Sequence, residues 1–535
     1  MMSMNARIFT NLIVIAAALN AVLAGCTAAQ TAAPTATRPA VAASAATATS
    51  VNTPLPKDTT APTAWPAATS QPAAPAVTSP TAPVASESVE MQGLSLHNGD
   101  FYFSTGGKQS LVFSRNLTGI QQSDFDTILD WTKIGGSRLV RIQVDSLGMG
   151  YTSTGGMDEA WAQKWEQVFD KANADGISML LVFSGWFDWN NGSPNYDYST
   201  WGSNPMNLAN GGPAQTPAEL FKNGSVTQKA WLEWVKSLVV RWQGRKNIAA
   251  WEIFSEVNLA TGATERTGTA LVEQTAAVIR AADAGHRPVT ASLADVGNWP
   301  NFYRSSAIDF INIHPYPGSG QLDTTILDAV RKQRARYNKP VLIGESGLSS
   351  AAPSSTLPNL TTAANAGRGI NHAIWATLVS GAMNGRGLYW EDSFAIYFPD
   401  FGLPFVQKYA TADLAASAFI KGVDLAGFKP LTVDLSAGPL LKGAALGSDQ
   451  FVIGWFRDSQ CEPPDWNLQP LVSKQAVKIS VPGAASGAGS WQVDFYNAAT
   501  GKDISSSITV TGKGGQFMVA LPDFKDEVVF KMYVK

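Results

Sequence analysis

Two glutamates that directly follow apolar, strand-like runs are the leading candidates for chemistry in this sequence. The run from Trp251 to Ser255 precedes Glu256, and the run from Val341 to Gly344 precedes Glu345. If both runs are parallel barrel strands, their carboxyl ends meet at one edge and bring the two side chains together. One carboxyl group can then protonate the leaving oxygen of a glycoside, while the other attacks or stabilises the cationic sugar. Burial and mutual closeness separate the two pKa values and give each group its own role.

These glutamates need a framework of parallel strands, and the sequence from about residue 98 predicts one. Short apolar runs alternate with segments of helical period, such as the stripe from Trp161 to Ala172 and the stripe from Trp231 to Trp242. The tryptophans of both stripes are predicted to face the core. The predicted strands are 111–116, 138–144, 178–184, 248–255, 288–293, 308–314, 340–345 and 387–391. The predicted helices are 122–135, 159–175, 226–244, 264–284, 299–305, 323–338, 363–384 and 410–420.

Eight strand–helix alternations predict a (β/α)8 TIM barrel over residues 91–427, which would be the catalytic domain. A doubly wound open sheet is the alternative, but no glycine-rich phosphate loop follows an early strand. After residue 428 the pattern changes to β-rich segments, such as Phe451–Phe456 and Trp491–Tyr496, separated by Gly, Pro and Asp turns. Residues 428–535 are therefore predicted to form a small C-terminal β-sandwich domain, for which a structural role is favoured and glycan binding is the alternative.

The N-terminus predicts an export signal and a tether. Arg7 precedes an apolar run that is too short to span a bilayer comfortably and that ends in Leu23-Ala24-Gly25-Cys26. This ending resembles a bacterial lipobox, which implies that residues 1–25 are a lipoprotein signal peptide and that Cys26 is lipidated. An ordinary signal peptide with an incidental cysteine is the alternative. Residues 26–90 are almost wholly Ala, Thr, Pro, Ser and Val, a composition that predicts a disordered linker.

The composition limits the partners that the chain can have. Its net charge of -3 leaves no basic excess for nucleic acid. Two cysteines cannot form a disulfide framework, and four histidines without metal-ligand spacing argue against zinc. We expect no metal and no organic cofactor, a passive thiol at Cys461, and a monomer whose partner is a polysaccharide or oligosaccharide. Contact with a membrane is expected only through a lipid on Cys26, which places the protein outside the cytoplasm at the bacterial cell membrane or surface.

The ordered set of strand ends resembles one enzyme family. The stretch from Asn247 to Glu256 resembles the acid/base motif of clan A glycoside hydrolases, in particular family 5, whose retaining members include β-mannanases and cellulases. The segment Gly344–Gly347 is similar to the nucleophile motif of that family. The resemblance covers roughly residues 98 to 425 and implies that Glu256 is the acid/base and Glu345 the nucleophile.

Four further positions match in the same order, and the resemblance implies a substrate-site role for each. Arg141 would hold the nucleophile ionised, and Tyr316 would donate its hydroxyl to Glu345. His314 would hydrogen-bond the acid/base or a sugar hydroxyl. Trp390 would supply a stacking platform under the cleaved sugar.

The match departs from the family at two positions. Ser255 stands where the family has the asparagine that contacts the 2-hydroxyl of the sugar. Serine is shorter and offers one hydroxyl in place of an amide, so we expect a water-mediated contact and a weaker activity or an altered sugar preference. Gly185-Trp186 replaces a histidine that many members have after the third strand, which tilts the prediction toward mannan-type substrates. Trp186 begins a long segment running to about Pro217, whose aromatic residues are candidate sugar subsites: Trp189, Tyr196, Tyr198 and Trp201.

The sequence therefore predicts a retaining β-glycosidase, endo-acting on β-mannan or β-glucan. Two alternatives stay open. A non-catalytic surface glycan-binding lipoprotein would keep the barrel as a scaffold, and Ser255 is the residue that favours it. An exo-acting β-glycosidase would need the long segment after the third strand to close one end of the cleft.

Overall fold

A computed structural model describes residues 94–117, 125–191, 200–317, 320–347, 363–387, 413–463, 466–484 and 489–535. The signal-peptide and linker predictions, with Cys26, lie outside these residues. Among the described helices, none combines the length and the apolar character that a membrane crossing requires.

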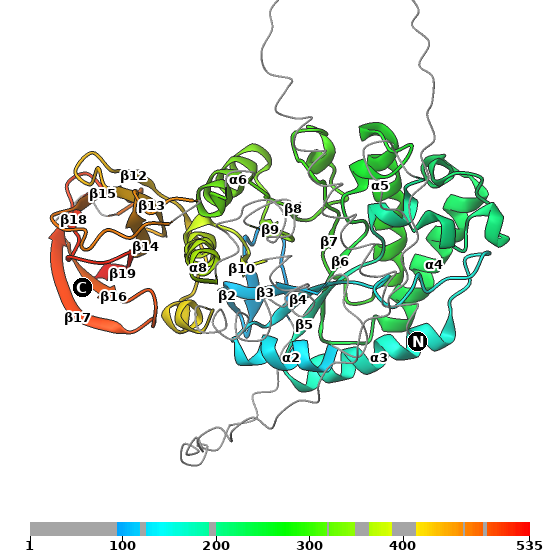
Figure 1. Ribbon diagram of the computed structural model, residues 1–535, viewed down its shortest axis with the longest axis horizontal. Coiled ribbons are helices and arrows are strands. Elements are labelled where there is room, and N and C mark those ends of the chain that lie inside the picture. Colours follow the sequence, from blue (N-terminus) through cyan, green and yellow to red (C-terminus); the bar gives the residue numbers. More distant parts are fainter. Residues whose placement is uncertain are drawn as a thin grey trace, which may run out of the picture. The chain divides into compact units, whose positions relative to one another are not determined.

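Eight parallel strands of the described chain form a barrel (Figure 1). Six of them form one sheet in the order β10-β3-β4-β5-β6-β7, and β8 and β9 form a parallel pair. A parallel bridge from Ser292 to Asn312 joins β7 to β8, and the Met383 N–H donates to the Val341 carbonyl between β9 and β10. The predicted (β/α)8 barrel is thereby confirmed. The strands are β3 (Val112–Asn116), β4 (Leu139–Gln143), β5 (Ser178–Val182), β6 (Ile248–Glu252), β7 (Val289–Thr290), β8 (Ile311–Ile313), β9 (Val341–Ile343) and β10 (Asn384–Arg386).

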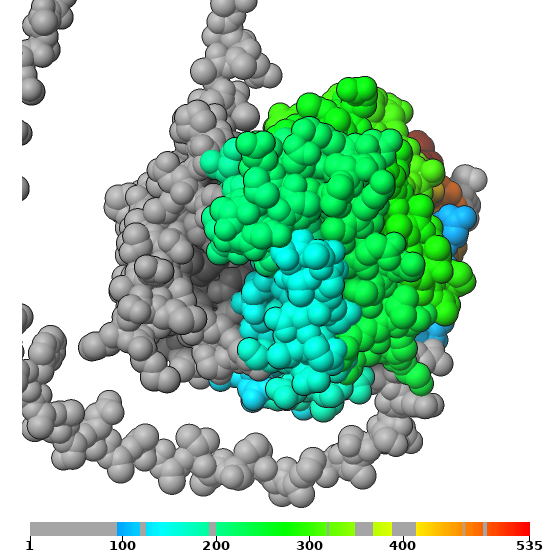
Figure 2. Space-filling view, turned by 90° about the vertical axis from the view of Figure 1, so that its right-hand side faces the viewer, coloured from blue at the N-terminus to red at the C-terminus, as the bar shows by residue number. Residues whose placement is uncertain are grey.

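Helices cover the outside of the strands, as Figure 1 shows. On the side of the molecule shown in Figure 2, the described surface consists mainly of cyan and green residues of the barrel. The tryptophans of both predicted stripes are buried, because they fill the layer between helices and strands. The predicted helix 299–305 is only a 3-10 turn, Phe302–Arg304. The helices are α2 (Phe125–Ile134), α3 (Glu159–Ala174), α4 (Val226–Trp242), α5 (Glu265–Ala282), α6 (Leu322–Tyr337), α8 (Ala363–Ser380) and a last segment at 413–420.

The inside of the barrel has its own apolar core. Alternate strand residues such as Val112, Leu180 and Leu342 form one buried cluster, as expected when successive side chains of a strand point to opposite faces. Phe103 joins this cluster from a hairpin of β1 (Phe103–Thr105) and β2 (Lys108–Ser110) that precedes the first barrel strand. The hairpin therefore packs against the barrel core at one end. The candidate site lies at the opposite end, where the barrel strands end.

The eighth strand was predicted at 387–391, and this prediction is wrong. Helix α8 ends at Ser380, Gly381 adopts φ +91, and the strand β10 follows at Asn384–Arg386. Only Gly387 of the predicted strand lies in the described residues, and it has left the strand. The apolar run up to Met383 continues the helical pattern, so the sequence predicts a helix that is too long. Asn384, Gly385 and Arg386 have little β-propensity, so the sequence does not predict a strand there. Tertiary pairing with β3 decides the strand here.

The C-terminal segment is a sandwich of two antiparallel sheets, as predicted. A six-stranded sheet has the order β11-β13-β14-β19-β16-β17, and a three-stranded sheet has the order β12-β15-β18. Apolar side chains of both sheets, such as Val452, Ile479 and Phe517, form one buried cluster between them. The strands are β11 (Lys429–Pro430), β12 (Thr432–Asp434), β13 (Leu441–Gly447), β14 (Phe451–Asp458), β15 (Ala476–Ser480), β16 (Ser490–Tyr496), β17 (Asp503–Thr511), β18 (Gln516–Ala520) and β19 (Glu527–Val534).

The larger sheet also packs on the barrel helices α6 and α8. Trp455 and Val529 belong to the same buried cluster as the barrel. Arg457 of β14 donates to Asp323 of α6 at 2.6 Å, an ion pair that is almost fully buried. The barrel and the sandwich therefore share a core. The predicted boundary between them at residues 427 and 428 stays a prediction.

Candidate active site

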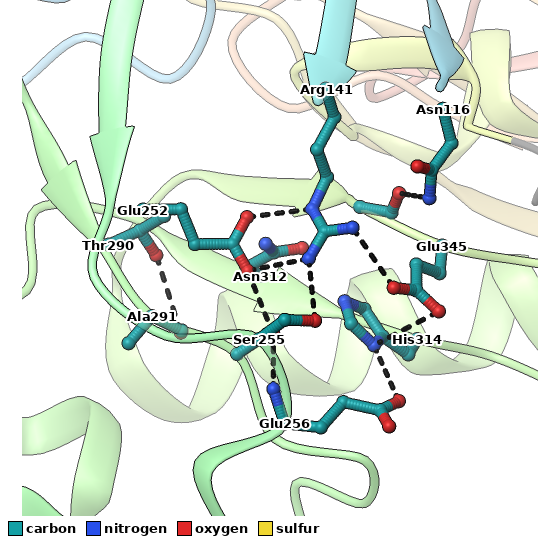
Figure 3. A network of polar contacts seen from close by, with 12 residues as sticks. Asn116, Arg141, Glu252, Ser255, Glu256, Thr290, Ala291, Asn312, His314 and Glu345 are labelled. Carbon is teal, nitrogen blue, oxygen red and sulfur yellow. Dashed lines mark hydrogen bonds and ion pairs between the residues drawn. The ribbon is translucent and has the colours of Figure 1, made fainter. Parts of the chain in front are cut away.

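The polar side chains of the candidate site lie at or just past the carboxyl ends of four barrel strands (Figure 3). Arg141 lies in β4, and Glu252 ends β6, shortly before Glu256. His314 directly follows β8, and Glu345 follows β9 by one residue. The barrel thus brings together residues that are more than 200 positions apart in the sequence, such as Arg141 and Glu345.

Arg141 is the centre of the hydrogen-bond network in Figure 3. Its Nε and Nη2 each donate to Glu252 at 2.7 Å, and its Nη1 donates to Glu345 at 3.0 Å. Nη2 also donates to the Ser255 hydroxyl oxygen at 2.9 Å. Burial alone would lower the pKa of Arg141, but Glu252 and then Glu345 raise it above its ordinary value. This side chain is a permanent cation with fixed donor directions.

Glu345 is held from several sides. Its second oxygen accepts from the Tyr316 hydroxyl at 2.9 Å and lies 3.7 Å from Nδ1 of His314. Its backbone is fixed by the residue before it, since the Asn116 amide donates to the Gly344 carbonyl at 3.0 Å. A Cβ at position 344 would lie 2.1 Å from Oδ1 of Asn312, so only glycine fits there. The nucleophile candidate therefore has little freedom to reorient.

Glu256 lies where the chain turns away from β6. Its backbone is in the left-handed region, with φ +55, which costs free energy for a residue other than glycine. Two bonds to Ser292 hold this turn: the Glu256 N–H donates to the Ser292 hydroxyl at 3.0 Å, and the Val257 N–H donates to the Ser292 carbonyl at 3.1 Å. The carboxyl group of Glu256 lies 2.8 Å from Nδ1 of His314. The strained turn aims this side chain toward the centre of the site.

The two candidate catalytic carboxyl groups are close, buried and electrostatically different. Oxygens of Glu256 and Glu345 lie within 4.8 Å of each other. Burial, and then the charge of Glu345, raise the pKa of Glu256 above its ordinary value, although His314 opposes the shift. Burial alone would raise the pKa of Glu345 too, but His314, Arg141 and the Tyr316 hydroxyl lower it below its ordinary value. At a pH between the two pKa values Glu256 is protonated and Glu345 is ionised, the state that an acid and a nucleophile require.

Three other predicted site residues have different outcomes. Ser255 lies beside the acid/base, and its hydroxyl accepts from Arg141. The N–H of Trp186 donates to the Ser255 carbonyl at 3.1 Å, and its buried ring contacts Phe187 edge to face. Trp390 lies outside the described residues. The contacts of these residues with a sugar stay predictions.

The segment after β5 contains a buried aromatic pair. Trp189 and Trp201 were candidate sugar subsites, but both rings are almost fully buried, with centroids 5.8 Å apart. The Trp189 indole donates to Ser184 at 3.0 Å. Within the described residues, these two rings hold the segment onto the barrel, while Tyr196 and Tyr198 lie outside those residues.

A second pair of carboxyl groups lies at the ends of β4 and β5. Burial and the neighbouring Asp188 raise the pKa of Asp145 well above its ordinary range, and burial raises that of Asp188. Asp188 accepts from the Thr200 hydroxyl at 2.7 Å, and its negative charge is one of the causes that raise the pKa of Asp145. Two neighbouring buried carboxyl groups of this kind titrate together, and the pair holds a proton more strongly than an isolated carboxyl group does.

We expect an Asp145→Asn variant to gain stability relative to the wild type as the pH rises. A carboxyl group with a raised pKa binds more protons in the folded than in the unfolded state, so the wild type loses stability above about pH 4 and up to the raised value. The amide mimics the protonated acid and has no such loss. The apparent Tm of the variant should match the wild type near pH 4 and exceed it by about 2 °C at pH 8. Asp188→Ala is the control, because it removes the acceptor for the Thr200 hydroxyl and should be destabilised throughout. A lower Tm for Asp145→Asn at every pH would contradict the raised pKa of Asp145.

Two groups of described side chains bring metal-ligand atom types within 4.8 Å of one another. The first is Glu256, His314 and Glu345, where the Arg141 cation opposes a metal ion. The second is His372, Cys461 and Asp526, which the fold brings together although their spacing in the sequence does not suggest it. His372 already contacts Asp526 at 2.8 Å, and burial raises the pKa of the Cys461 thiol to about 12. In each group the histidine is already paired with a carboxylate, His314 with Glu256 and His372 with Asp526.

Sequence reasoning missed Glu252 and Ser292. Both are fully buried and belong to the hydrogen-bond network that holds the two candidate catalytic groups. A signal was present, because Glu252 and Arg141 are opposite charges inside apolar strand runs and buried charges need partners. No comparable signal marks Ser292.

Comparison with known proteins supports the same fold. No protein-family model matches the chain. Mannan endo-1,4-beta-mannosidase 3 of Oryza sativa subsp. japonica is 26% identical over 193 residues, which cover 31% of this chain and 40% of the rice protein. The crystal structure of a glycoside hydrolase family 5 protein from Bacteroides vulgatus matches with a TM-score of 0.51 and 13% identity over 82% of this chain and 93% of that one. The known proteins that this chain resembles in fold and in sequence are thus glycoside hydrolases, and the structural neighbours include family 5 of clan A.

Proposed function

We propose that this chain is a retaining β-glycoside hydrolase that cleaves within β-mannan or β-glucan chains. The observation that carries the proposal is the pair of buried carboxyl groups, Glu256 and Glu345, with oxygens within 4.8 Å and pKa values shifted in opposite directions. Retaining glycosidases keep their two carboxyl groups about 5 Å apart, whereas inverting enzymes leave about 6.5–9.5 Å for a water molecule. The close approach therefore favours retention.

The reaction would proceed in two displacements. In the first, an oxygen of Glu345 bonds to the anomeric carbon as the bond to the leaving oxygen breaks, and the proton of Glu256 moves to that oxygen. In the second, Glu256 takes a proton from water, the water oxygen bonds to the anomeric carbon, and Glu345 leaves. Arg141 and Tyr316 would stabilise the carboxylate of Glu345 before it attacks and again as it leaves in the second step.

The substrate class follows from the relative that is similar in sequence. The rice relative is by name an endo-1,4-β-mannosidase, which favours β-mannan over β-glucan. Trp186, Trp390 and Ser255 are proposed to contact the sugar. We also propose a lipid anchor on Cys26 and a position outside the cytoplasm. A Cys26→Ser variant that still partitions with membranes would contradict the anchor.

The test is the release of reducing ends from β-mannans, β-glucans and xylan, with NMR analysis of the first anomer formed. We expect cleavage of β-mannan with retained configuration, and long early products if the action is internal. Early release of only mono- or disaccharides would indicate the exo-acting alternative. A chain that cleaves no polymer but is retained on one of them would be a glycan-binding lipoprotein.

A further inference from the structure

Glu252 is a buried carboxylate that takes no part in the proposed displacements. It ends β6, four residues before Glu256, and none of its surface is exposed. Both of its oxygens accept from Arg141 at 2.7 Å, and one also accepts from the Ser292 hydroxyl at 2.9 Å. A fully buried charge with this many directed bonds has a role beyond filling space.

We propose that Glu252 is a positioning residue that holds both catalytic carboxyl groups, Glu345 through Arg141 and Glu256 through Ser292. This inference rests on the proposed function, because it assigns Glu252 to the same site. Figure 3 shows Glu252 on one side of the Arg141 guanidinium and Glu345 on the other.

The connection to Glu345 depends on the planar fork of Arg141. Glu252 binds the Nε and Nη2 edge through two parallel bonds, which fixes the guanidinium plane. The remaining Nη1 then has one direction, in which Glu345 accepts at 3.0 Å. Glu252 also partly neutralises the positive charge of Arg141. Arg141 therefore stabilises the Glu345 carboxylate less than it would if Glu252 were uncharged.

The connection to Glu256 depends on the direction of one hydroxyl hydrogen. The Ser292 hydroxyl donates to Glu252, so its oxygen is left to accept the Glu256 N–H at 3.0 Å. That bond lies at the strained residue, where φ is +55. Without the Glu252 acceptor, the hydroxyl hydrogen is free to turn away, and the turn loses an aligned partner.

Loss of the Glu252 charge has a direction that can be measured. The charged and titratable groups around it are Arg141 from β4, Glu256 and His314 at the mouth, Glu345 after β9 and Tyr303 in the turn Phe302–Arg304. Removing one buried anion favours the ionised form of the remaining carboxyl groups. Both limbs of the pH–activity profile should therefore move to lower pH.

The test compares Glu252→Gln, Glu252→Asp and Ser292→Ala in the full chain. For Glu252→Gln we expect both limbs of the kcat/KM profile to shift down by about half a pH unit or more. Glu252→Asp keeps the negative charge but moves it away from Arg141, because the side chain is shorter. Its kcat should therefore fall, while both limbs of the pH–activity profile stay in place. Ser292→Ala should lower kcat about tenfold, again with unshifted limbs. Asp323→Asn, which removes a buried carboxylate far from the site, is the control: it should lower Tm and leave the profile unchanged.

Two results would overturn the proposal. Unshifted limbs in Glu252→Gln, with activity lost in proportion to Tm, would leave Glu252 as an ordinary structural ion pair. Wild-type kcat in Ser292→Ala would remove the connection to Glu256. Titration of 13C-labelled glutamates by NMR measures the same shifts without a substrate. It therefore separates failure of this proposal from failure of the proposed glycosidase activity.

Discussion

A Glu345→Ala variant should retain the fold of the wild type and lose its glycosidase activity, with kcat lower by a factor on the order of 10⁴ or more. The reason is that no other described carboxylate is placed to bond to the anomeric carbon from the same side. Glu252 is enclosed by Arg141 and Ser292, and Glu256 is needed as the acid. The measurement is release of reducing ends from the polymer that the wild type cleaves.

Azide identifies the role that was removed. A small anion can occupy the space left by the Glu345 side chain and attack the sugar directly, so added azide should restore part of the rate and give a glycosyl azide of inverted configuration. Glu233→Ala, a side chain that is 72% exposed, is the matched control and should keep wild-type activity. Rescue with retained configuration, or no loss of activity at all, would assign the nucleophile to another residue.

The sequence predicted the barrel because its signal is repeated along the chain. Apolar runs bounded by amphipathic segments predicted seven of the strands, and the carboxyl-end rule then placed Glu256 and Glu345 near each other. The resemblance to the family added Arg141, His314 and Tyr316, which the structure places around the same two glutamates. The eighth strand escaped because Asn384, Gly385 and Arg386 are placed by pairing with β3 and by contacts with β9, which local composition does not report.

Interactions within the site were harder to predict than its members. The left-handed turn at Glu256, the hydroxyl direction of Ser292 and the clash that requires Gly344 depend on the distance between strands, which no single strand encodes. The acid pair of Asp145 and Asp188 shows the same limit, because each residue alone reads as a loop carboxylate. Opposite charges in two apolar strands were the one available sign of the pair between Glu252 and Arg141.

A Glu256→Gln variant should divide substrates according to their leaving groups. Cleavage of a polysaccharide needs a proton at the leaving oxygen, so its kcat/KM should fall about 10³-fold. An aryl glycoside with an acidic phenol leaves without that proton, so formation of the glycosyl-enzyme should be nearly unchanged while its hydrolysis slows. We therefore expect a burst of phenol followed by slow turnover, together with a lowered KM.

The pH profile of the same variant gives an independent sign. Wild-type activity requires Glu345 ionised and Glu256 protonated, so it falls as the pH drops through the lowered pKa of Glu345 and as it rises through the raised pKa of Glu256. Glutamine cannot lose a proton, so the basic limb should disappear and the acidic limb should remain. Azide should accelerate turnover and give a glycosyl azide of retained configuration, the opposite of the Glu345→Ala product. Equal losses on polymer and aryl glycoside would show that Glu256 acts by holding the site together, since only a proton donor distinguishes the two leaving groups.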